Sequence, residues 1–194
     1  LTRLKANGTF QTLIVLLNGA NPLQLDFLKD EKIAVDACLW IGNTGMTGIR
    51  AVAKALTGEV VPSGRLTDTF VYGNLSSPAM AAWALNQNGQ FSAQYDTKTL
   101  NNTQKAYGVY SEGIYVGYRY YDTYGKVVDY PFGYGLSYAT FEIDDVAAAK
   151  TGANTATVTA TVTNTSDVDA AETVQVYVAP GKADVARPKH ELKG

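Results

Sequence analysis

Few residues of this chain could do nucleophilic or metal chemistry. The 194 residues include a single cysteine, Cys38, and a single histidine, His190. Cys38 lies in an apolar, strand-like run (37–41) with no histidine nearby in the sequence, so we interpret it as a small buried hydrophobic residue. His190 lies in a charged stretch, where we expect a surface or edge position. One cysteine and one histidine cannot form a zinc site of the usual kind, so we predict neither a metal nor a cofactor.

Four acidic residues stand in conspicuous motifs and are the candidates for acid or base chemistry. Glu59 follows a predicted helix end, Asp68 lies on an extended segment, and Glu112 and Asp122 flank a run of tyrosines. No two of them have a spacing that would place carboxylates on opposite sides of one substrate. We therefore interpret them as hydrogen-bonding or ion-pairing groups, with Arg119 as the expected partner of Glu112 or Asp122.

A weaker set of candidates for ligand contact follows the apolar run 37–41. It consists of Asn43, Thr44 and Met46. Ligands of open α/β sheets bind beyond the carboxyl ends of the strands, which is where this loop is expected. A turn formed by Asn and Gly is the simpler explanation, so the substrate-binding residues stay unknown.

Strands and helices are predicted to alternate in the first part of the chain, which positions several of these residues. Strand signals at Thr12–Leu17 and Ile33–Ile41 alternate with helix signals at Leu23–Lys29 and from Thr47 to Gly58, where Gly58 caps the helix. This order predicts a parallel sheet covered on both faces. Two strands cannot form such a sheet alone, so the segment resembles the last part of a larger α/β domain.

The second half of the chain has a different character. Most of the 13 tyrosines gather with glycines before residue 139, which predicts an ordered seam between two packed parts. The preceding polar stretch, 71–106, is expected to be irregular, with a mobile loop at 86–103. From residue 139 the alternation of side chains predicts about three strands, two of them at 155–163 and 172–178, where a β-sandwich has roughly seven.

Composition excludes several classes of partner. The net charge of −2 gives no reason to expect nucleic acid or an anionic membrane. The longest apolar runs are far shorter than a membrane span. No signal peptide is visible, and a bacterial cytoplasmic location is favoured over secretion.

Three motifs are long enough to be specific. They are GEVVPSGRLTDTF at 58–70, EGIYVGYRYYD at 112–122 and YPFGYGLSY at 130–138. In this order they resemble the C-terminal part of the family 3 glycoside hydrolases, the β-glucosidase-type enzymes. The end of the chain also fits, because 158–178 is similar to the family's "VTNTG … VQLY" strands and 187–194 to its "RP.KELKG" segment.

The resemblance implies a fold and a domain division. Residues 1–75 would be the C-terminal part of an α/β sandwich domain, 76–138 an irregular Tyr/Gly-rich interdomain segment, and 139–194 an incomplete fibronectin type III-like domain. The expected fold class is therefore α/β (a partial α/β sandwich) followed by a partial all-β sandwich. In the branch of the family that 17–25 and 37–42 resemble most, these domains precede the catalytic barrel.

The resemblance also implies retaining hydrolysis of a β-linked terminal sugar from a glucoside or oligosaccharide. Such enzymes use two carboxylates about 5–5.5 Å apart, a nucleophile and an acid/base. In the family the nucleophile is an Asp of the barrel, and the acid/base is generally a Glu on a sandwich loop upstream of the PSGRL segment. Neither has a match here, so no catalytic residue is expected. The expected partner is the remainder of the same polypeptide.

Two other functions stay open. A non-catalytic carbohydrate-binding or adhesion module would bind sugar through this chain alone, whereas a structural scaffold would bind none. Trp40, Trp83 and the tyrosines could stack on sugar rings, but packing between domains explains the tyrosines better. Homo-oligomers are also left open.

Overall fold

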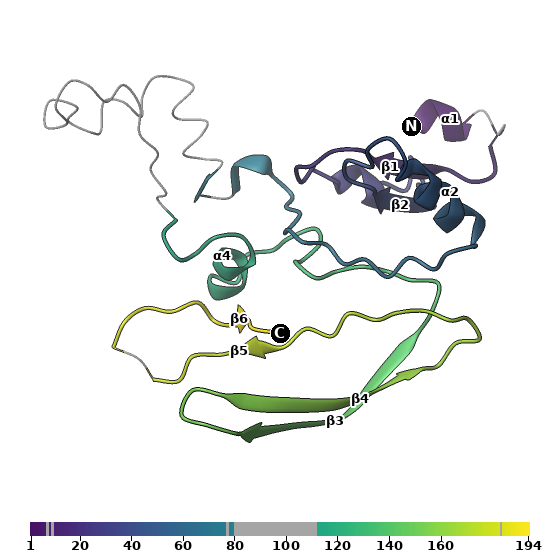
Figure 1. Ribbon diagram of the computed structural model, residues 1–194. Coiled ribbons are helices and arrows are strands. Elements are labelled where there is room, and N and C mark those ends of the chain that lie inside the picture. Colours follow the sequence, from purple (N-terminus) through teal and green to yellow (C-terminus); the bar gives the residue numbers. More distant parts are fainter. Residues whose placement is uncertain (7, 9, 77, 80–111, 183) are drawn as a thin grey trace, which may run out of the picture.

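The computed structural model describes residues 1–6, 8, 10–76, 78–79, 112–182 and 184–194. Figure 1 shows the described part in three tiers. The N-terminal helices and strands form the upper tier, α4 and its neighbouring segments the middle one, and the strands β3 to β6 the lower one. The chain thus passes from an α/β part through a connecting segment to an all-β part.

The α/β part begins the chain. Its elements are α1 (Thr2–Ala6), β1 (Ile14–Leu17), η1 (Asp26–Lys29), β2 (Ala37–Trp40), α2 (Ile49–Thr57) and η2 (Asn74–Ser76). β1 and β2 pair in parallel, with Ile14 opposite Ala37 and Leu17 opposite Trp40. The predicted parallel pairing is confirmed, although both strands are shorter than expected. The predicted helix at Leu23–Lys29 forms only as the 3₁₀ turn η1.

The buried core lies on one face of the β1–β2 sheet. Leu17, Leu25 and Phe70 form its centre, and Phe70 is only 1% exposed. The ring of Trp40 meets Phe70 edge to face, with the ring centroids 5.3 Å apart. Cys38 packs against the same cluster, and partial burial raises the pKa of its thiol. These contacts support a packing role for Cys38 and keep its thiol protonated.

Helix α2 ends where the sequence predicts. Gly58 adopts a left-handed backbone (φ 77°), and its N–H donates to the carbonyl oxygens of Ala55 and Lys54. This is the glycine cap expected from the pattern. The apolar side of the helix keeps Ile49 and Leu56 exposed, at 50% and 39%. The described residues therefore cover this side only in part.

The tyrosine-rich segment is joined to the α/β part through its backbone. Phe70 and Tyr130 form an antiparallel bridge, in which the Phe70 N–H donates to the Tyr130 carbonyl at 2.9 Å. The Leu66 N–H donates to the Tyr134 carbonyl at 2.8 Å. The expectation that this whole segment is irregular is wrong in one place, because α4 (Tyr118–Thr123) is a helix. Its sequence contains neither glycine nor proline, so nothing local prevents a helical turn.

The all-β part contains two antiparallel pairs. Its strands are β3 (Phe141–Lys150), β4 (Ala156–Asn164), β5 (Tyr177–Val178) and β6 (Glu191–Leu192). The strand expected at 155–163 is confirmed as β4, while the one expected at 172–178 forms only as β5. The alternation expected from residue 139 gave no bounds for β3. A register shift between Asp144 and Ala147, with Asp145 at φ 50°, interrupts the alternation of side chains there.

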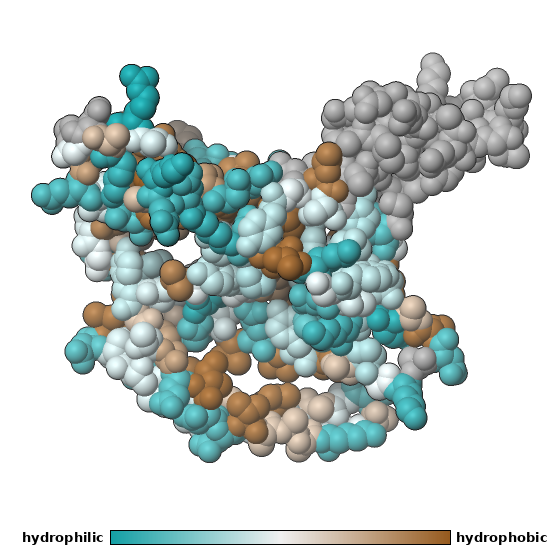
Figure 2. Space-filling model, turned by 180° about the vertical axis from the view of Figure 1, so that it is seen from behind, coloured by the Kyte–Doolittle hydropathy of each residue, from teal (hydrophilic) through white to brown (hydrophobic). Residues whose placement is uncertain are grey.

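The β3–β4 hairpin has no buried residue. Every residue of β4 is exposed, as is every residue of β3 after Phe141. Ile143 lies opposite Val162 and Ala148 opposite Val158, which gives one face an apolar row. Figure 2 shows brown, hydrophobic residues along the lower edge of the molecule, with an opening between this layer and the part above. The described residues leave the apolar row uncovered.

Some expectations fall on residues outside the described ranges. These are the loop at 86–103 and the side chain of Trp83, which stay predictions. In the described part of the chain, no helix is long and apolar enough to span a membrane.

Candidate functional site

Arg65 of the PSGRL segment joins three stretches of chain. Its Nη2 contacts both carboxylate oxygens of Glu172 at 2.5 Å, and its Nε donates to Oε1 at 3.2 Å. Its Nη1 donates to the carbonyl oxygen of Gly135. The side chains of Arg65 and Glu172 are only 15% and 13% exposed, and hydrogen bonds from Arg65 lower the pKa of Glu172. No local pattern in the sequence indicates this pair, and the only signal is the position of Arg65 in a long motif.

Two glycines of the YPFGYGLSY motif allow the close contact around Arg65. Gly133 has φ 80°, and a Cβ atom there would collide with the side chain of Gln175. At Gly135 a Cβ atom would lie 2.7 Å from the carbonyl oxygen of Gly64 and 3.0 Å from Cδ of Arg65. Glycine is therefore required at both positions because other segments of the chain pack too closely for a Cβ atom.

A second long-range ion pair lies between η1 and the tyrosine-rich segment. Lys29 Nζ is 2.9 Å from Oδ1 of Asp129 and donates to the Tyr72 hydroxyl at 2.8 Å. The carboxylate of Asp129 is fully buried, whereas the Lys29 side chain is 45% exposed. The hydrogen bond with Tyr72, followed by that with Asp129, raises the pKa of Lys29 above its usual range. No local sequence signal identified this pair either.

Helix α4 is docked on the segment that contains β6. Asp122 Oδ2 lies 2.9 Å from His190 Nε2, and the Lys189 N–H donates to the Thr123 hydroxyl oxygen at 2.9 Å. The Leu192 N–H donates to the Tyr118 hydroxyl oxygen at 2.8 Å. The His190 ring also stacks on that of Tyr118, with centroids 6.2 Å apart. The His190 side chain is 28% exposed and directly precedes β6, which is compatible with the expected surface or edge position, and its ring packs in this contact.

Arg119 does not pair with the residues expected from the sequence. Its Nε lies 3.4 Å from Oε1 of Glu191, while Asp122 pairs with His190. The Nε–H is buried, and its alignment is too poor for a hydrogen bond. The expected pairing of Arg119 with Glu112 or Asp122 is thus wrong, because β6 brings a carboxylate that is distant in the sequence.

Three of the four acidic candidates use their carboxylates in separate contacts. Glu59 pairs with Lys54 at 2.9 Å, and Oδ1 of Asp68 accepts the N–H of the next residue at 2.8 Å. Asp122 is occupied by His190, as described above. The backbone carbonyl of Glu112 accepts the Tyr115 N–H at 3.0 Å. None of these contacts brings two of the four carboxylates together.

The loop after β2 holds the weaker candidates for ligand contact. Asn43 and Met46 are exposed and Thr44 is half-buried. The neighbouring Trp40 donates from its indole Nε1–H to the carbonyl oxygen of Gly19 at 2.7 Å, which joins the end of β2 to the loop after β1. The indole ring itself packs against Phe70. Trp40 is therefore a core residue here and not an exposed platform for a sugar.

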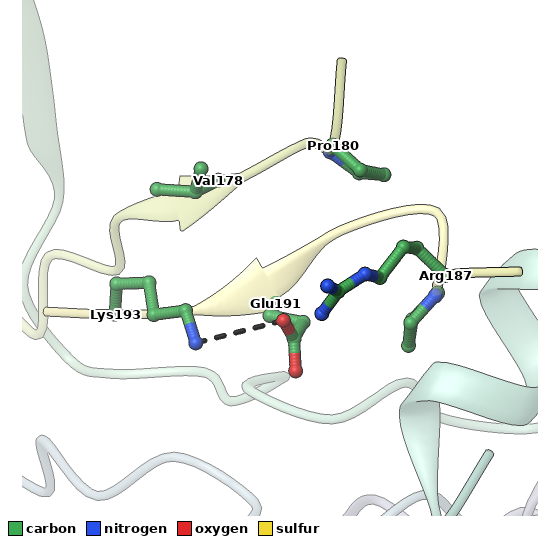
Figure 3. Close-up of a pocket in the computed structure, with 6 residues that line it drawn as sticks. Val178, Pro180, Arg187, Glu191 and Lys193 are labelled. Carbon is green, nitrogen blue, oxygen red and sulfur yellow. Dashed lines mark ion pairs between the residues drawn. The ribbon is translucent and has the colours of Figure 1, made fainter. Parts of the chain in front are cut away.

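Two shallow cavities open beside the all-β part. The first, of about 300 Å³, lies next to β5 and β6 and is shown in Figure 3 with Arg187, Glu191 and Lys193 along it. Lys193 Nζ is 3.5 Å from Oε2 of Glu191, so the single carboxylate is already paired. The second, of about 230 Å³, lies next to Arg65 and Gln175. Neither cavity holds two carboxylates.

The described residues contain no group of three or more His, Cys, Asp or Glu side chains that could hold a metal ion. Several of their ion pairs join distant segments, among them Lys29–Asp129, Arg65–Glu172, Arg119–Glu191 and Asp122–His190, whereas Lys54–Glu59 and Lys193–Glu191 are local. This arrangement can fix the position of one part of the chain on another. It offers no acid and base on opposite sides of a shared cavity.

Comparison with known proteins gives a consistent family. Residues 2–118 match the model of the glycosyl hydrolase family 3 C-terminal domain. The chain is 53% identical over 182 residues to an exo-alpha-(1->6)-L-arabinopyranosidase of Bifidobacterium longum, covering 94% of this chain but 21% of that protein. The chain thus spans about a fifth of the length of this relative.

Solved structures agree with this match. A family 3 β-glucosidase of Bifidobacterium adolescentis superposes with a TM-score of 0.74 at 50% identity, over 93% of this chain and 24% of that one. β-Glucosidase 3B of Thermotoga neapolitana, solved in complex with glucose, gives a TM-score of 0.78 at 36% identity, over 100% of this chain and 24% of that one. The model of the family 3 C-terminal domain matches more than half of the chain. The chain therefore belongs to glycosyl hydrolase family 3.

Proposed function

We propose that this chain is the non-catalytic scaffold of a larger retaining glycoside hydrolase that removes a terminal sugar. The observation that carries the proposal is the engagement of Glu59, Asp68 and Asp122 in separate contacts, and the two cavities found among the described residues hold no pair of carboxylates. Retaining hydrolysis needs two carboxylates about 5–5.5 Å apart. The nucleophile and the acid/base are therefore assigned to the remainder of the polypeptide.

The proposed substrate is a β-linked glucoside or oligosaccharide. Several relatives are named as β-glucosidases, including one of Ruminococcus albus that is 32% identical over 191 residues. A second candidate is an α-(1->6)-linked L-arabinopyranoside, since the relative with 53% identity carries that name. The groups that would choose between these sugars belong to the catalytic part, so both substrates enter the test.

The all-β part is proposed to be an incomplete fibronectin type III-like sandwich within residues 139–194. Its apolar row, which includes Ile143 and Val162, faces no described residue, and Figure 2 shows an opening beside this layer. A β-sandwich covers such a row with a second sheet. Residues 1–75 would then belong to the α/β sandwich and 76–138 to the segment between the two domains.

The proposal is tested by comparing two proteins, residues 1–194 alone and the longer polypeptide that contains them. Both are assayed with aryl β-glucosides and aryl α-L-arabinopyranosides, and the configuration of the first product is followed by NMR. We expect turnover with retention from the longer protein and none from residues 1–194. Turnover by residues 1–194 would show that this chain carries the catalytic groups. Sugar binding by both proteins without turnover would instead favour the carbohydrate-binding module.

A further inference from the structure

The contact between α4 and the segment that contains β6 includes the only histidine of the chain. Nε2 of His190 lies 2.9 Å from Oδ2 of Asp122, and both residues are partly buried. The imidazole also stacks on the ring of Tyr118 and meets the ring of Tyr177 edge to face, with centroids 6.2 and 4.9 Å away. Side chains of α4 and β5 thus hold the imidazole beside a carboxylate.

Two backbone hydrogen bonds flank this histidine. The Lys189 N–H donates to the Thr123 hydroxyl oxygen at 2.9 Å, and the Leu192 N–H donates to the Tyr118 hydroxyl oxygen at 2.8 Å. Both acceptors belong to α4, which lies next to β6 in Figure 1. The protection of these two amides from hydrogen exchange therefore measures how tightly the end of the all-β part stays on α4.

Other charged and titratable groups lie around the imidazole. In the described part of the chain, the elements of this contact and the sequence neighbours of the histidine carry Tyr118, Arg119, Tyr120, Tyr121 and Asp122 of α4, Tyr177 of β5, Glu191 of β6, and Arg187, Lys189 and Lys193. Arg119 and Lys193 both lie against Glu191, at 3.4 and 3.5 Å. Burial, followed by electrostatic interaction with Tyr118 and Asp122, raises the pKa of Tyr177. Of these side-chain types, imidazole is the one that ordinarily changes its charge between pH 5 and 8.

We propose that His190 and Asp122 form a pH-sensitive latch that holds the end of the all-β part on α4. While the ring is neutral, the contact is at best a hydrogen bond from an uncharged donor. Protonation of the ring turns it into an ion pair with the carboxylate, which is a stronger contact. The latch is therefore tighter near pH 5 than near pH 8, and its stabilising contribution is lost as the pH rises. This inference does not depend on the proposed function.

The first test measures hydrogen exchange of the peptide 187–194 in the longer protein between pH 8 and pH 5, with each protection factor corrected for the intrinsic pH dependence of exchange. In the wild type we expect protection to rise about two- to fivefold as the pH falls, the range of a partly exposed ion pair. His190→Gln can still donate to Asp122 but cannot become charged, so it should show no rise. A peptide that contains Leu66 is the internal reference, since the contact made by Arg65 is constant above pH 4.5.

Two further variants separate the effect of charge from that of packing. Asp122→Asn leaves the ring free to take up a proton but removes the carboxylate, so protection of the same peptide should not rise on acidification. His190→Lys carries a positive charge throughout this pH range, so its protection should stay constant from pH 8 to pH 5. In the wild type, salt at about 1 M should reduce the gain at pH 5, because it screens an ion pair more than a neutral hydrogen bond.

The outcomes decide between the latch and a contact that is only structural. A rise of protection in the wild type that both His190→Gln and Asp122→Asn abolish would support the latch. Should His190→Gln fail to fold, Asp122→Asn alone gives the comparison, since it keeps the histidine. An equal rise in wild type and Asp122→Asn would mean that another group drives the response and would overturn the inference. Constant protection of the wild-type peptide from pH 8 to pH 5 would also overturn it, and neither result bears on glycoside turnover.

Discussion

The β1–β2 sheet and the β3–β4 hairpin are both two-stranded, yet only the first has a core. β1 and β2 lie on the cluster of Leu17, Leu25 and Phe70, to which Trp40 adds an aromatic contact. β3 and β4 are longer and pair over more residues, but no residue in either is buried. Backbone pairing alone therefore does not distinguish a sheet with its own core from one that needs a partner.

Long-range contacts join the tyrosine-rich segment both to the α/β part and to the all-β part. The α/β part is joined to the tyrosine-rich segment by Lys29–Asp129 and by the bridge from Phe70 to Tyr130. That segment is joined to the all-β part by the docking of α4 beside β6, and Arg65–Glu172 joins the PSGRL segment directly to the all-β part. The middle tier thus contacts both ends of the described molecule, and Tyr118, Tyr121 and Tyr130 take part in its packing.

The largest expected effect comes from the core beneath β1 and β2. Phe70→Ala should destabilise this region by about 3–5 kcal/mol, because it removes a fully buried ring together with the partner of Trp40. Hydrogen exchange of the β1 and β2 amides, followed by mass spectrometry in the longer protein, measures the loss. Unchanged protection of these amides would mean that another part of the protein supplies their stability.

The Arg65–Glu172 pair should come next. Arg65→Met should cost about 2–3 kcal/mol, since it leaves a mostly buried carboxylate without its hydrogen-bonded partner. The readout is hydrogen exchange at Leu66 and Gly133, whose amides lie in the connected backbones. Lys54→Met is the matched control, because the exposed Lys54–Glu59 pair should be worth less than about 1 kcal/mol. Equal effects at both sites would remove the distinction between buried and exposed pairs.

The same pair predicts a pH dependence with a definite sign. Arg65 lowers the pKa of Glu172 in the folded protein below the ordinary value of 4.5. The pair therefore stabilises fully above pH 4.5, and this contribution is lost as the pH falls through the lower, folded pKa. The protection factor of the Leu66 amide, corrected for the intrinsic pH dependence of exchange, should fall on acidification below pH 4.5 in the wild type more than in Glu172→Gln. An identical acid dependence in both proteins would contradict the assignment.

The smallest effect is expected in the hairpin. Ile143→Ala in residues 1–194 should cost less than about 1 kcal/mol, because this side chain is 45% exposed. In the longer protein the same change should cost about 2–4 kcal/mol if a second sheet covers the apolar row. Exchange of the β4 amides in both proteins gives the comparison. A small cost in both settings would argue against the proposed sandwich.

The sequence predicted elements whose signals are local. β1, β2, β4, α2 and the Gly58 cap follow from runs of apolar residues, alternation and helical spacing. No bounds were predicted for β3 because the irregularity around Asp145 shifts its side chains to the other face partway along the strand. Helix α4 was missed because glycines before and after it made the whole segment look irregular.

The contacts between distant segments could not be predicted from a single sequence. Nothing near Arg65 indicates Glu172, and nothing near Asp122 indicates His190, since folding alone brings these pairs together. Residue types could only suggest that each charge needs a partner. The family motifs marked Gly133 and Gly135 correctly, but their reason, the close approach of other chain segments, required the structure.

The central claim is that this chain supports catalysis without providing its carboxylates, and covalent labelling tests it most directly. A retaining hydrolase forms a glycosyl–enzyme intermediate, which a slow 2-fluoro glycoside substrate can accumulate on the nucleophile. The longer protein is labelled, digested and mapped by mass spectrometry. The account predicts a label on a carboxylate outside residues 1–194. A label on Glu59, Asp68, Glu112 or Asp122 would contradict it.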